Sequence, residues 1–518
     1  MGKEQERAEL HRIIWSIADD LRGTVSGWEF KSYILGMLFY RFISENITNH
    51  LNEKMHKLGQ SDFDYTKLDD KTAENARQTT TEEKGFFILP SQLFANVREG
   101  AKDNENLNET LSAVFDAIER SAKGTDSEQD FSGLFDDIDV NSTKNLGATV
   151  AKRNERLAKI LDKIAALPLG NFQDNTIDLF GDAYEYLIKM YASNAGKSGG
   201  EYFTPQEVSE LLAKITTVGK KEVNKVYDPC CGSGSLLLKF AKILGKDKVR
   251  QGFFGQEAEP TIYNLCRINM FLHNINFEKF DIALGDTLLE PKHWDDEPFD
   301  CIVSNPPYSI KWVGDDDIKL INDQRFAPAG VLAPKSKADL AFTMHMLSWL
   351  STQGTAAIVE FPGVLYRGGA EQKIRQYLID NNFVDAVIQL PSDLFFGTSI
   401  ATCIIVLKKS KKENSIVFID ASKLFVHEGN KNKLTDDNIA TILEAFISRK
   451  DQDHFCKVVK NEDILANYCN LSVSSYVEQE DTREKVDITK LNLDIAAIVE
   501  RQQVLRAEID KIVADLEK

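Results

Sequence analysis

Residues 225–244 read KVYDPCCGSGSLLLKFAKIL, and this stretch decides the fold. Lys225–Tyr227 predicts a strand, and Ser235–Leu244 has the apolar periodicity of a helix. Between them, Gly232 and Gly234 let the backbone turn sharply and approach a ligand, with helix N–H groups pointing at it. The order strand, glycine loop, helix predicts the first crossover of an α/β sheet. A tight turn without a ligand is the alternative.

Short apolar runs continue to alternate with helical segments from about residue 170 onward. This alternation is typical of a parallel α/β sheet. Polar motifs follow its strands, which predicts that ligands bind at the carboxyl edge of a doubly wound sheet. The expected strands are Lys225–Tyr227, Gly252–Gly255, Cys301–Ser304, Thr355–Phe361, Val384–Leu390, Ala401–Leu407 and Ser415–Ile419. The expected helices are Ser235–Leu244, Glu259–Ile275, Ala338–Leu350 and Ala370–Asn381.

The N-terminal part of the chain predicts helices instead. Trp28–Ile47 is strongly apolar and amphipathic, but it is too short and too charged to cross a bilayer. The other helical segments are Glu6–Asp20, Leu107–Ala122 and Ala151–Leu167. We therefore expect a helical domain over residues 1–165, an α/β domain over 166–475 and a helical tail over 476–518.

Composition limits the class of protein further. The 518 residues include 42% hydrophobic and 27% charged residues, which is typical of a folded globular chain without a membrane span. Seven cysteines without a C-x-x-C pair indicate a reduced cytoplasm and no structural zinc, and the eight histidines lack metal-ligand spacing. The net charge of −18 repels phosphate, so any DNA contact must be local or shared with a partner.

An acidic residue strengthens the case for a ligand at the glycine loop. Glu257 ends the next apolar run, GFFGQE, at the position where an acid would hold the hydroxyls of a ribose. Taken alone, Glu257 has an alternative interpretation as an acidic residue at the start of a helix. Strand, glycine loop, helix, strand and acid in this order favour a nucleoside cofactor.

A second polar motif follows a buried strand at residues 299–308, FDCIVSNPPY. Two consecutive prolines fix a rigid extended loop, which points the Asn305 amide and the Pro306 carbonyl in set directions. Such acceptors suit an exocyclic amine, and Tyr308 offers a ring on which a planar base can stack. Phe395 and Phe396 are weaker candidates for the other face of that base.

These motifs resemble those of the N6-adenine type of S-adenosylmethionine-dependent amino-methyltransferases. Several further segments narrow the likeness to the modification subunit of type I restriction–modification systems, a gamma-class enzyme. They are GEYFTP (200–205), GWEFKSYILGMLFYRFIS (27–44), FPGVLYRGG (361–369), VDAVIQLP (384–391) and FFGTSIATCIIVL (395–407). The likeness covers nearly the whole chain. It departs at Cys230 and Cys231, where the family often has small residues.

The resemblance implies a Rossmann-like methyltransferase domain and a site-specific DNA adenine-N6 methyltransferase activity. Asn305, Pro306 and Tyr308 would be the catalytic residues, acting on an adenine flipped from the duplex, with no metal. The implied binding site for the cofactor, S-adenosylmethionine, consists of Glu201, Tyr202, Phe203, Thr204, Pro205, Gln206, Asp228, Gly232, Ser233, Gly234, Ser235, Glu257 and Asp286. Two alternatives remain from the residues: a protein-glutamine or RNA amino-methyltransferase, and a cofactor-binding scaffold without activity.

The C-terminal helix predicts a partner. Its apolar residues alternate in steps of four and three, which is the seam of a coiled coil, interrupted by one polar residue. They are Leu491, Ile495, Ile498, Gln502, Leu505, Ile509, Ile512 and Leu516. Packing of this helix on its own catalytic domain is the alternative. The resemblance implies double-stranded DNA and a specificity subunit as partners, with two copies of this chain, and a restriction subunit that adds nuclease and translocase activity.

Overall fold

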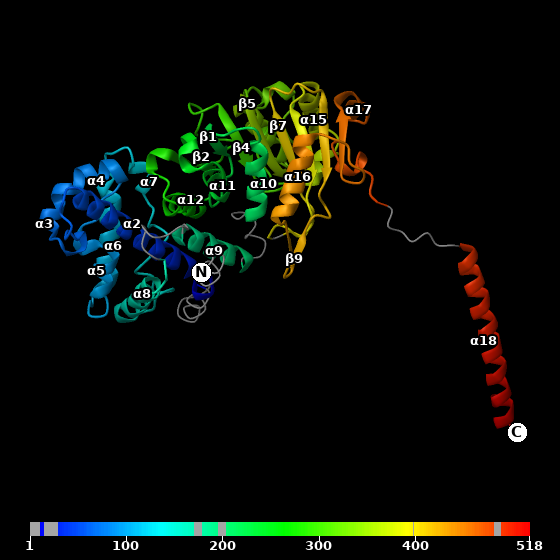
Figure 1. Cartoon of the computed structure of the whole chain (residues 1–518), viewed down its shortest axis with the longest axis horizontal. Helices are drawn as coiled ribbons and strands as arrows, with labels where there is room; N and C mark the ends of the chain where they lie inside the picture. The colour runs from blue at the N-terminus through cyan, green and yellow to red at the C-terminus, as the bar shows by residue number, and fades with distance from the viewer. Residues whose placement is uncertain are drawn as a thin grey trace. The chain divides into compact units, whose positions relative to one another are not determined.

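The computed structural model of the protein describes residues 11–14, 30–169, 179–194, 204–396, 398–480 and 488–517. The chain divides into two compact units, residues 1–477 and 478–518, and each is described by itself. The larger unit contains the N-terminal helices and the sheet together (Figure 1). The predicted boundary near residue 165 therefore stays a prediction.

The N-terminal helices of the larger unit pack around α2 (Phe30–Lys57). The predicted helix over 28–47 is confirmed from Phe30 onward, whereas most of the one predicted over 6–20 lies outside the described residues. Arg41 of α2 is 9% exposed and donates to the carbonyls of Ile164 and Leu167, which ties α2 to the end of α8. The other helices here are α3 (Asp70–Ala73), α4 (Arg77–Lys84), α5 (Phe94–Glu99), α6 (Leu107–Ser121), α7 (Glu128–Phe131), α8 (Val150–Ala165) and α9 (Leu179–Asn194).

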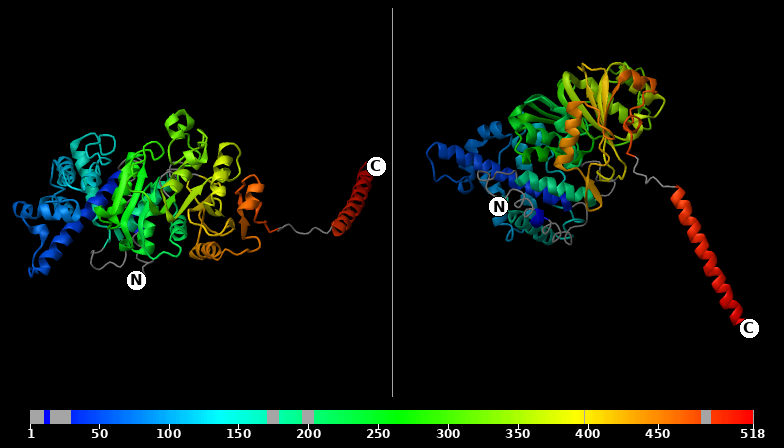
Figure 2. Two further views of the ribbon diagram at one scale, coloured as in Figure 1. Left: turned by 90° about the horizontal axis from the view of Figure 1, so that it is seen from above. Right: turned by 45° about the vertical axis from the view of Figure 1, so that its right-hand side comes forward.

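A nine-stranded sheet follows, in the order β11-β8-β6-β7-β5-β4-β1-β2-β3. Figure 2 shows its twist from two further sides. Its strands are β1 (Val223–Asp228), β2 (Val249–Glu257), β3 (Phe280–Leu284), β4 (Phe299–Ser304), β5 (Leu350–Glu360), β6 (Val384–Gln389), β7 (Cys403–Lys408), β8 (Ser415–Asp420) and β11 (Cys456–Lys460). A separate hairpin pairs β9 (Val426–Glu428) with β10 (Lys431–Lys433).

The sheet is mixed, so the prediction of a parallel sheet is wrong for β7, and β11, which the sequence did not predict, is also antiparallel. β7 lies antiparallel between β5 and β6, and β11 pairs antiparallel with β8. A parallel neighbour needs a long crossover, usually a helix, whereas the chain between β6 and β7 has no helix in its described residues. The other seven strands of the sheet, β1 to β6 and β8, all run in the same direction, as predicted for a parallel sheet.

Helices cover both faces of the sheet, as a doubly wound fold requires. Alternate strand residues belong to two different cores: Val226 and Val303 to one, Tyr227 and Ile302 to the other. The first core contains residues of α10 (Gln206–Thr216), α11 (Ser235–Leu244), α12 (Pro260–Leu272) and α16 (Asp436–Ser448). The second contains residues of α14 (Asp339–Trp349), α15 (Ala370–Asp380) and α17 (Asn461–Ala466), and the short α13 (Ile318–Ile321) lies before α14 in the chain.

The smaller unit contains one long helix, α18 (Ile488–Leu516), with no buried residue. All seven apolar residues of the predicted seam are at least 48% exposed. No described helix is long and apolar enough to cross a membrane.

Candidate active site

The glycine loop after β1 is built for close packing. Gly234 precedes α11 with φ of +79°, and a Cβ there would lie 2.9 Å from Sγ of Cys266. Asn269 of α12 donates to the Ser233 carbonyl at 2.8 Å, and the hydroxyls of Ser233 and Ser235 lie 3.1 Å apart. Residues of α12 therefore hold the glycine loop in place, and α11 starts directly after it.

Asp228 ends β1 and is 0% exposed. Its Oδ1 accepts from the Cys230 N–H at 3.0 Å, while Oδ2 is buried without a hydrogen-bond partner among the described atoms. Burial raises the pKa of Asp228 to about 7, and the Cys230 N–H and nearby Ser304 hydroxyl oppose that rise. Asp228 Oδ2 can therefore accept a hydrogen bond from a donor on a bound ligand.

Glu257 ends β2 and reaches across to the glycine loop. Its Oε2 accepts from the Gly232 N–H at 3.1 Å, and its Oε1 accepts from the Glu259 N–H at 3.0 Å. Burial raises the pKa of Glu257, and these backbone donors oppose the rise. The structure thus brings the predicted acid and glycine loop together, and each carboxylate oxygen keeps room for a second donor.

A cavity of about 250 Å³ connects this side of the site to the loop after β4. Glu257, Asp286 and Asn305 all line it, together with Gln256, Thr287, Leu288, Trp312 and Phe342 among others. Asp286 is exposed at the cavity, where its Oδ1 accepts from the N–H groups of Leu288 and Leu289. Two residues predicted for the cofactor, Glu257 and Asp286, therefore share one cavity with Asn305, which is predicted for catalysis; the other predicted site residues that the structure describes are not among those that line it.

Both the nitrogen and the oxygen of the Asn305 side-chain amide are hydrogen-bonded. Its Nδ2 donates to Oγ1 of Thr204 at 3.1 Å, and its Oδ1 accepts from the Tyr308 hydroxyl at 2.6 Å. Tyr308 packs edge-on against Phe395 with ring centroids 6.3 Å apart, and Phe395 is 2% exposed. Phe395 thus belongs to the core behind Tyr308. Burial raises the pKa of the Tyr308 hydroxyl well above its usual range, so it remains a donor at neutral pH.

The segment before α10 is described only from residue 204, so Glu201, Tyr202 and Phe203 lie outside the described residues. Pro205 caps α10, and Gln206 is its first residue. Both amide atoms of Gln206 are buried and without a hydrogen-bond partner among the described atoms. One donor and one acceptor are therefore unsatisfied beside the Thr204–Asn305 contact.

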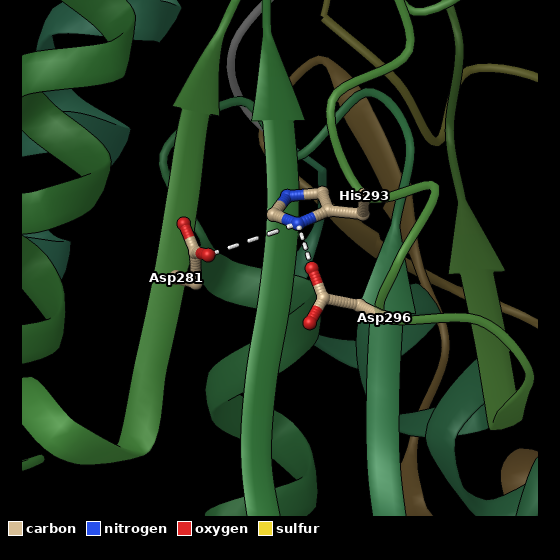
Figure 3. Close-up of side chains that lie close together, drawn as sticks. All are labelled: Asp281, His293 and Asp296. Atoms are coloured by element: carbon tan, nitrogen blue, oxygen red, sulfur yellow. Dashed lines mark hydrogen bonds and ion pairs between the residues drawn. The ribbon is translucent and has the colours of Figure 1, made fainter.

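A histidine fixes the connection from β3 to β4, part of which lines the cavity (Figure 3). His293 is 1% exposed, its Nε2 lies 2.9 Å from the Gly255 carbonyl, and its Nδ1 lies 3.0 Å from Asp296 and 3.9 Å from Asp281. Burial alone lowers the pKa of His293, but Asp296, Asp281 and the carbonyl outweigh it and raise the pKa. Nε2 donates to the Gly255 carbonyl, and Nδ1 pairs with the carboxylates. His293 therefore joins the β3–β4 connection to β2.

A buried arginine that no sequence motif indicates also shapes the cavity wall. Arg325 is 1% exposed and donates to the carbonyls of Thr287 and Leu288 at 2.8 and 2.7 Å, while Asp323 pairs with it. The Thr287 hydroxyl in turn donates to the Pro229 carbonyl. Arg325 lies in an irregular segment with no periodicity, so no sequence signal indicated it.

A doubly wound sheet with a glycine loop after β1, an acid at the end of β2 and Asn-Pro-Pro-Tyr after β4 defines an S-adenosylmethionine-dependent amino-methyltransferase. The family models agree. Residues 175–485 match the N-6 DNA methylase family, and residues 10–164 match the HsdM N-terminal domain. The chain belongs to the N-6 DNA methylase family, among the methylase subunits of type I restriction enzymes.

Individual relatives support this membership over nearly the whole chain. The type I restriction enzyme MpnII methylase subunit of Mycoplasma pneumoniae is 50% identical, covering 99% of this chain and 97% of the relative. The MjaVIII methylase subunit of Methanocaldococcus jannaschii is 31% identical over 71% of this chain and 66% of its own length. The solved type I methyltransferase subunit of Streptococcus thermophilus is 37% identical, with a TM-score of 0.81 over 91% of this chain and all of its own.

Proposed function

We propose that this chain methylates adenine N6 in double-stranded DNA, with S-adenosylmethionine in the cavity between Glu257 and Asn305. When bound, that cofactor supplies an electrophilic methyl group on a sulfonium. The observation that carries the proposal is the shared cavity: an acid suited to a ribose and an amide suited to an amine line the same space. Adenine N6 is paired in a duplex, so the base must leave the stack to reach it.

The unsatisfied groups of the site match the polar groups of the cofactor. Asp228 Oδ2 would accept from its ammonium group, and Gln206, with Thr204 and Pro205, would face its carboxylate. Glu257 would accept from both ribose hydroxyls while keeping its bonds to Gly232 and Glu259. Asp286, at the cavity, would accept from the amine of the cofactor's adenine ring. The residues Gly232, Ser233, Gly234 and Ser235 would face the cofactor through the backbone, and Glu201, Tyr202 and Phe203 complete the proposed site.

The catalytic step needs alignment, because the N6 lone pair is delocalised into the ring. Asn305 Oδ1 and the Pro306 carbonyl would accept from N6–H and direct the nitrogen toward the methyl group. Thr204 and Tyr308 would keep the Asn305 amide in the required orientation, since they occupy its donor and acceptor ends. The ring of Tyr308 would also contact the flipped base.

Helix α18 carries the proposed partner site. Seven exposed apolar residues along one seam require a covering surface that the helix itself lacks. We propose that the seam docks on the specificity subunit of a type I complex, which supplies base readout that a chain of net charge −18 cannot. Two copies of this chain and a restriction subunit would complete that complex.

A methyl-transfer experiment tests the proposal. The chain is produced with the specificity subunit of its own system and given labelled S-adenosylmethionine with duplex DNA, RNA or protein. We expect label in duplex DNA as N6-methyladenine, identified by mass spectrometry, and on the order of 10²–10³-fold slower labelling with Asn305→Ala. Label in RNA or in glutamine side chains, with none in DNA, would contradict the proposal and favour the amino-methyltransferase alternative.

A further inference from the structure

Three side chains that can bind a metal ion meet near the edge of the sheet (Figure 3). Asp281 comes from β3, the last strand in the sheet order, and His293 and Asp296 come from the connection between β3 and β4. One ligand atom from each residue lies within 4.8 Å of the other two. None of the three is among the described residues that line the cavity. The group is therefore separate from the proposed methyl-transfer site, and the fold rather than any sequence spacing brings it together.

The His293 ring is fixed in its orientation by packing and by a hydrogen bond. It is 1% exposed, and it packs edge-on against the rings of Tyr227 and Phe254, with centroid distances of 5.8 and 5.5 Å. Its Nε2 lies 2.9 Å from the Gly255 carbonyl, which can only accept, so Nε2 carries a proton. In the neutral ring, Nδ1 is then an acceptor. A metal-binding histidine typically has this arrangement, with its other nitrogen donating to a backbone carbonyl.

Nδ1 faces two carboxylates, and neither can donate a hydrogen bond when it is ionised. Oδ2 of Asp296 lies 3.0 Å from Nδ1, and Oδ2 of Asp281 lies 3.9 Å from it. Three acceptors that converge in this way repel one another unless a cation lies between them. A proton on Nδ1 can form a hydrogen bond with Asp296, but Asp281 is too far away for one. A metal ion can bind all three side chains.

The spacing of the ligand atoms suits a divalent transition-metal ion. Bonds of about 2.0–2.2 Å from the metal to nitrogen or oxygen place two ligand atoms about 3 Å apart at a right angle, and about 4 Å apart when they are nearly opposite. Both distances from Nδ1 lie in this range. The Asp281 side chain is 56% exposed, so it has room to turn toward an ion. An imidazole in the ligand set favours Zn²⁺ and related ions over Mg²⁺ and Ca²⁺, which prefer oxygen ligands.

The neighbouring charged groups leave the two carboxylates available to a cation. Lys225 lies near Asp296, but its Nζ donates to the backbone carbonyl of that residue. Asp130 of α7 adds a third acidic group near Asp281. Arg267, which lies near Asp130, donates to backbone carbonyls, including that of Gln129. An acidic environment of this kind attracts a divalent cation.

We propose that Asp281, His293 and Asp296 bind one divalent transition-metal ion, Zn²⁺ or a related ion, and that the ion holds the β3–β4 connection against the edge of the sheet. Nδ1 and one oxygen of each carboxylate are the ligands, and water completes the coordination on the exposed side. When no metal is bound, a proton on Nδ1 takes its place beside Asp296. The same connection contributes Asp286 to the cavity wall, so the ion steadies that wall. The metal site does not rest on the proposed function.

Calorimetry with Zn²⁺ on the reduced, chelator-treated full chain tests the site. We expect one saturable Zn²⁺ site per chain, which an excess of Mg²⁺ does not displace. X-ray absorption of the loaded protein should show nitrogen and oxygen ligands that include an imidazole, and no sulfur. The absence of sulfur distinguishes this site from binding to cysteines, of which only Cys230 is not fully buried.

Asp281→Asn is the sharpest variant, because Asp281 is exposed and the fold should not change. Losing one carboxylate ligand should weaken Zn²⁺ binding at least about 10-fold, the smallest effect typical of losing even an outer-shell partner. The matched control is Asp295→Asn, the same change at the exposed residue beside Asp296, and its affinity should equal that of the wild type. In His293→Gln the amide can still donate to the Gly255 carbonyl but offers no ring nitrogen, so saturable binding should be lost. If that variant does not fold, Asp281→Asn and its control decide the question.

Hydrogen exchange tests whether the ion holds the connection. Zn²⁺ should slow amide exchange within residues 285–298 in the wild type and in Asp295→Asn, but not in Asp281→Asn. Zn²⁺ binding without slower exchange in this segment would overturn the holding role.

The metal site itself is overturned by any of three results: no saturable Zn²⁺ binding by the wild type, equal affinities of Asp281→Asn and Asp295→Asn, or sulfur among the ligands. Each of these would leave His293 paired with the carboxylates through a proton alone. None of the measurements uses DNA or S-adenosylmethionine. Failure of the proposed function would therefore appear in the methyl-transfer experiment and leave these results unchanged.

Discussion

The strands at the active site and the terminal helix contain the same kinds of apolar side chain, yet bury them differently. Val303 of β4 and Ile358 of β5 are 0% exposed, whereas Ile498 and Leu505 of α18 are 66% and 52% exposed. Covering an apolar side chain is worth about 1.5–3 kcal/mol, so the sheet is stabilised by its own helices and α18 is not. The difference separates the two tasks that we propose: residues 1–477 contain the proposed methyl-transfer site, and residues 478–518 expose an apolar seam that we propose a partner covers.

The largest expected effect lies in the sheet unit and should leave assembly unchanged. Asn305→Ala removes the acceptor for adenine N6–H, so methylation in the complex should fall on the order of 10²–10³-fold. Affinity for S-adenosylmethionine, measured by calorimetry, should change less than about twofold, because the Asn305 side chain has the substrate amine as its partner. The exposed Asn322→Ala is the control. Equal loss of cofactor affinity and methylation would show that Asn305 acts on the cofactor instead.

A smaller effect is expected where the cofactor binds. Glu257→Ala leaves both ribose hydroxyls unpaired, which costs a few kcal/mol and weakens binding about 10- to 100-fold. The fold should persist, because the Glu257 carboxylate accepts from backbone N–H groups such as those of Gly232 and Glu259 and does not belong to an apolar core. The control is Glu290→Ala, the same change at an exposed acidic residue between β3 and β4, which should bind the cofactor normally. Unchanged affinity of Glu257→Ala in calorimetry would remove Glu257 from the site.

Tyr308 divides its contribution between ring and hydroxyl. Tyr308→Phe loses the hydrogen bond to Asn305, worth about 1 kcal/mol, and methylation should fall about fivefold. Tyr308→Ala also loses the stacked ring, worth ~1–3 kcal/mol per base, and should be slower still. The ratio of the two single-turnover rates measures the ring alone. Equal rates would show that the hydroxyl carries the whole role.

The smallest effect concerns pH. The pKa of Asp228 is raised to about 7, and a cationic ammonium group prefers the ionised carboxylate. Cofactor affinity should therefore increase about threefold between about pH 6.5 and about pH 7.5, as the ionised fraction of Asp228 rises, and level off above that range. Asp228→Asn should bind weakly and without this dependence. The sign for stability is opposite: without cofactor, the wild type should lose stability relative to Asp228→Asn as pH rises from about 4 to 7.

Local patterns predicted most of the fold. Ser235–Leu244 was predicted residue for residue, and apolar runs located β1, β2, β4, β5, β6, β7 and β8. The short β3 and β11 were missed, because charged residues within Phe280–Leu284 and Cys456–Lys460 interrupt their apolar runs. The antiparallel direction of β7 depends on sheet order, which apolar runs do not encode.

In the site, too, local patterns predicted some features, whereas contacts between distant segments could not be predicted. Glu257 and the glycine loop were recognisable because chain order alone places both at the carboxyl edge of the sheet. The contact between Thr204 and Asn305 joins segments 101 residues apart, and no spacing rule indicates it.

The separation of the two tasks is tested most directly by removing residues 487–518. Two readouts are compared on the same preparation: calorimetric affinity for S-adenosylmethionine and co-purification with the specificity subunit. A full-length Ile509→Lys variant, changed on the seam, and Glu508→Lys, changed off it, are the matched pair. We predict that truncation leaves cofactor affinity unchanged and abolishes co-purification, as does Ile509→Lys but not Glu508→Lys. A truncated chain that still assembles and methylates specific DNA would contradict this account.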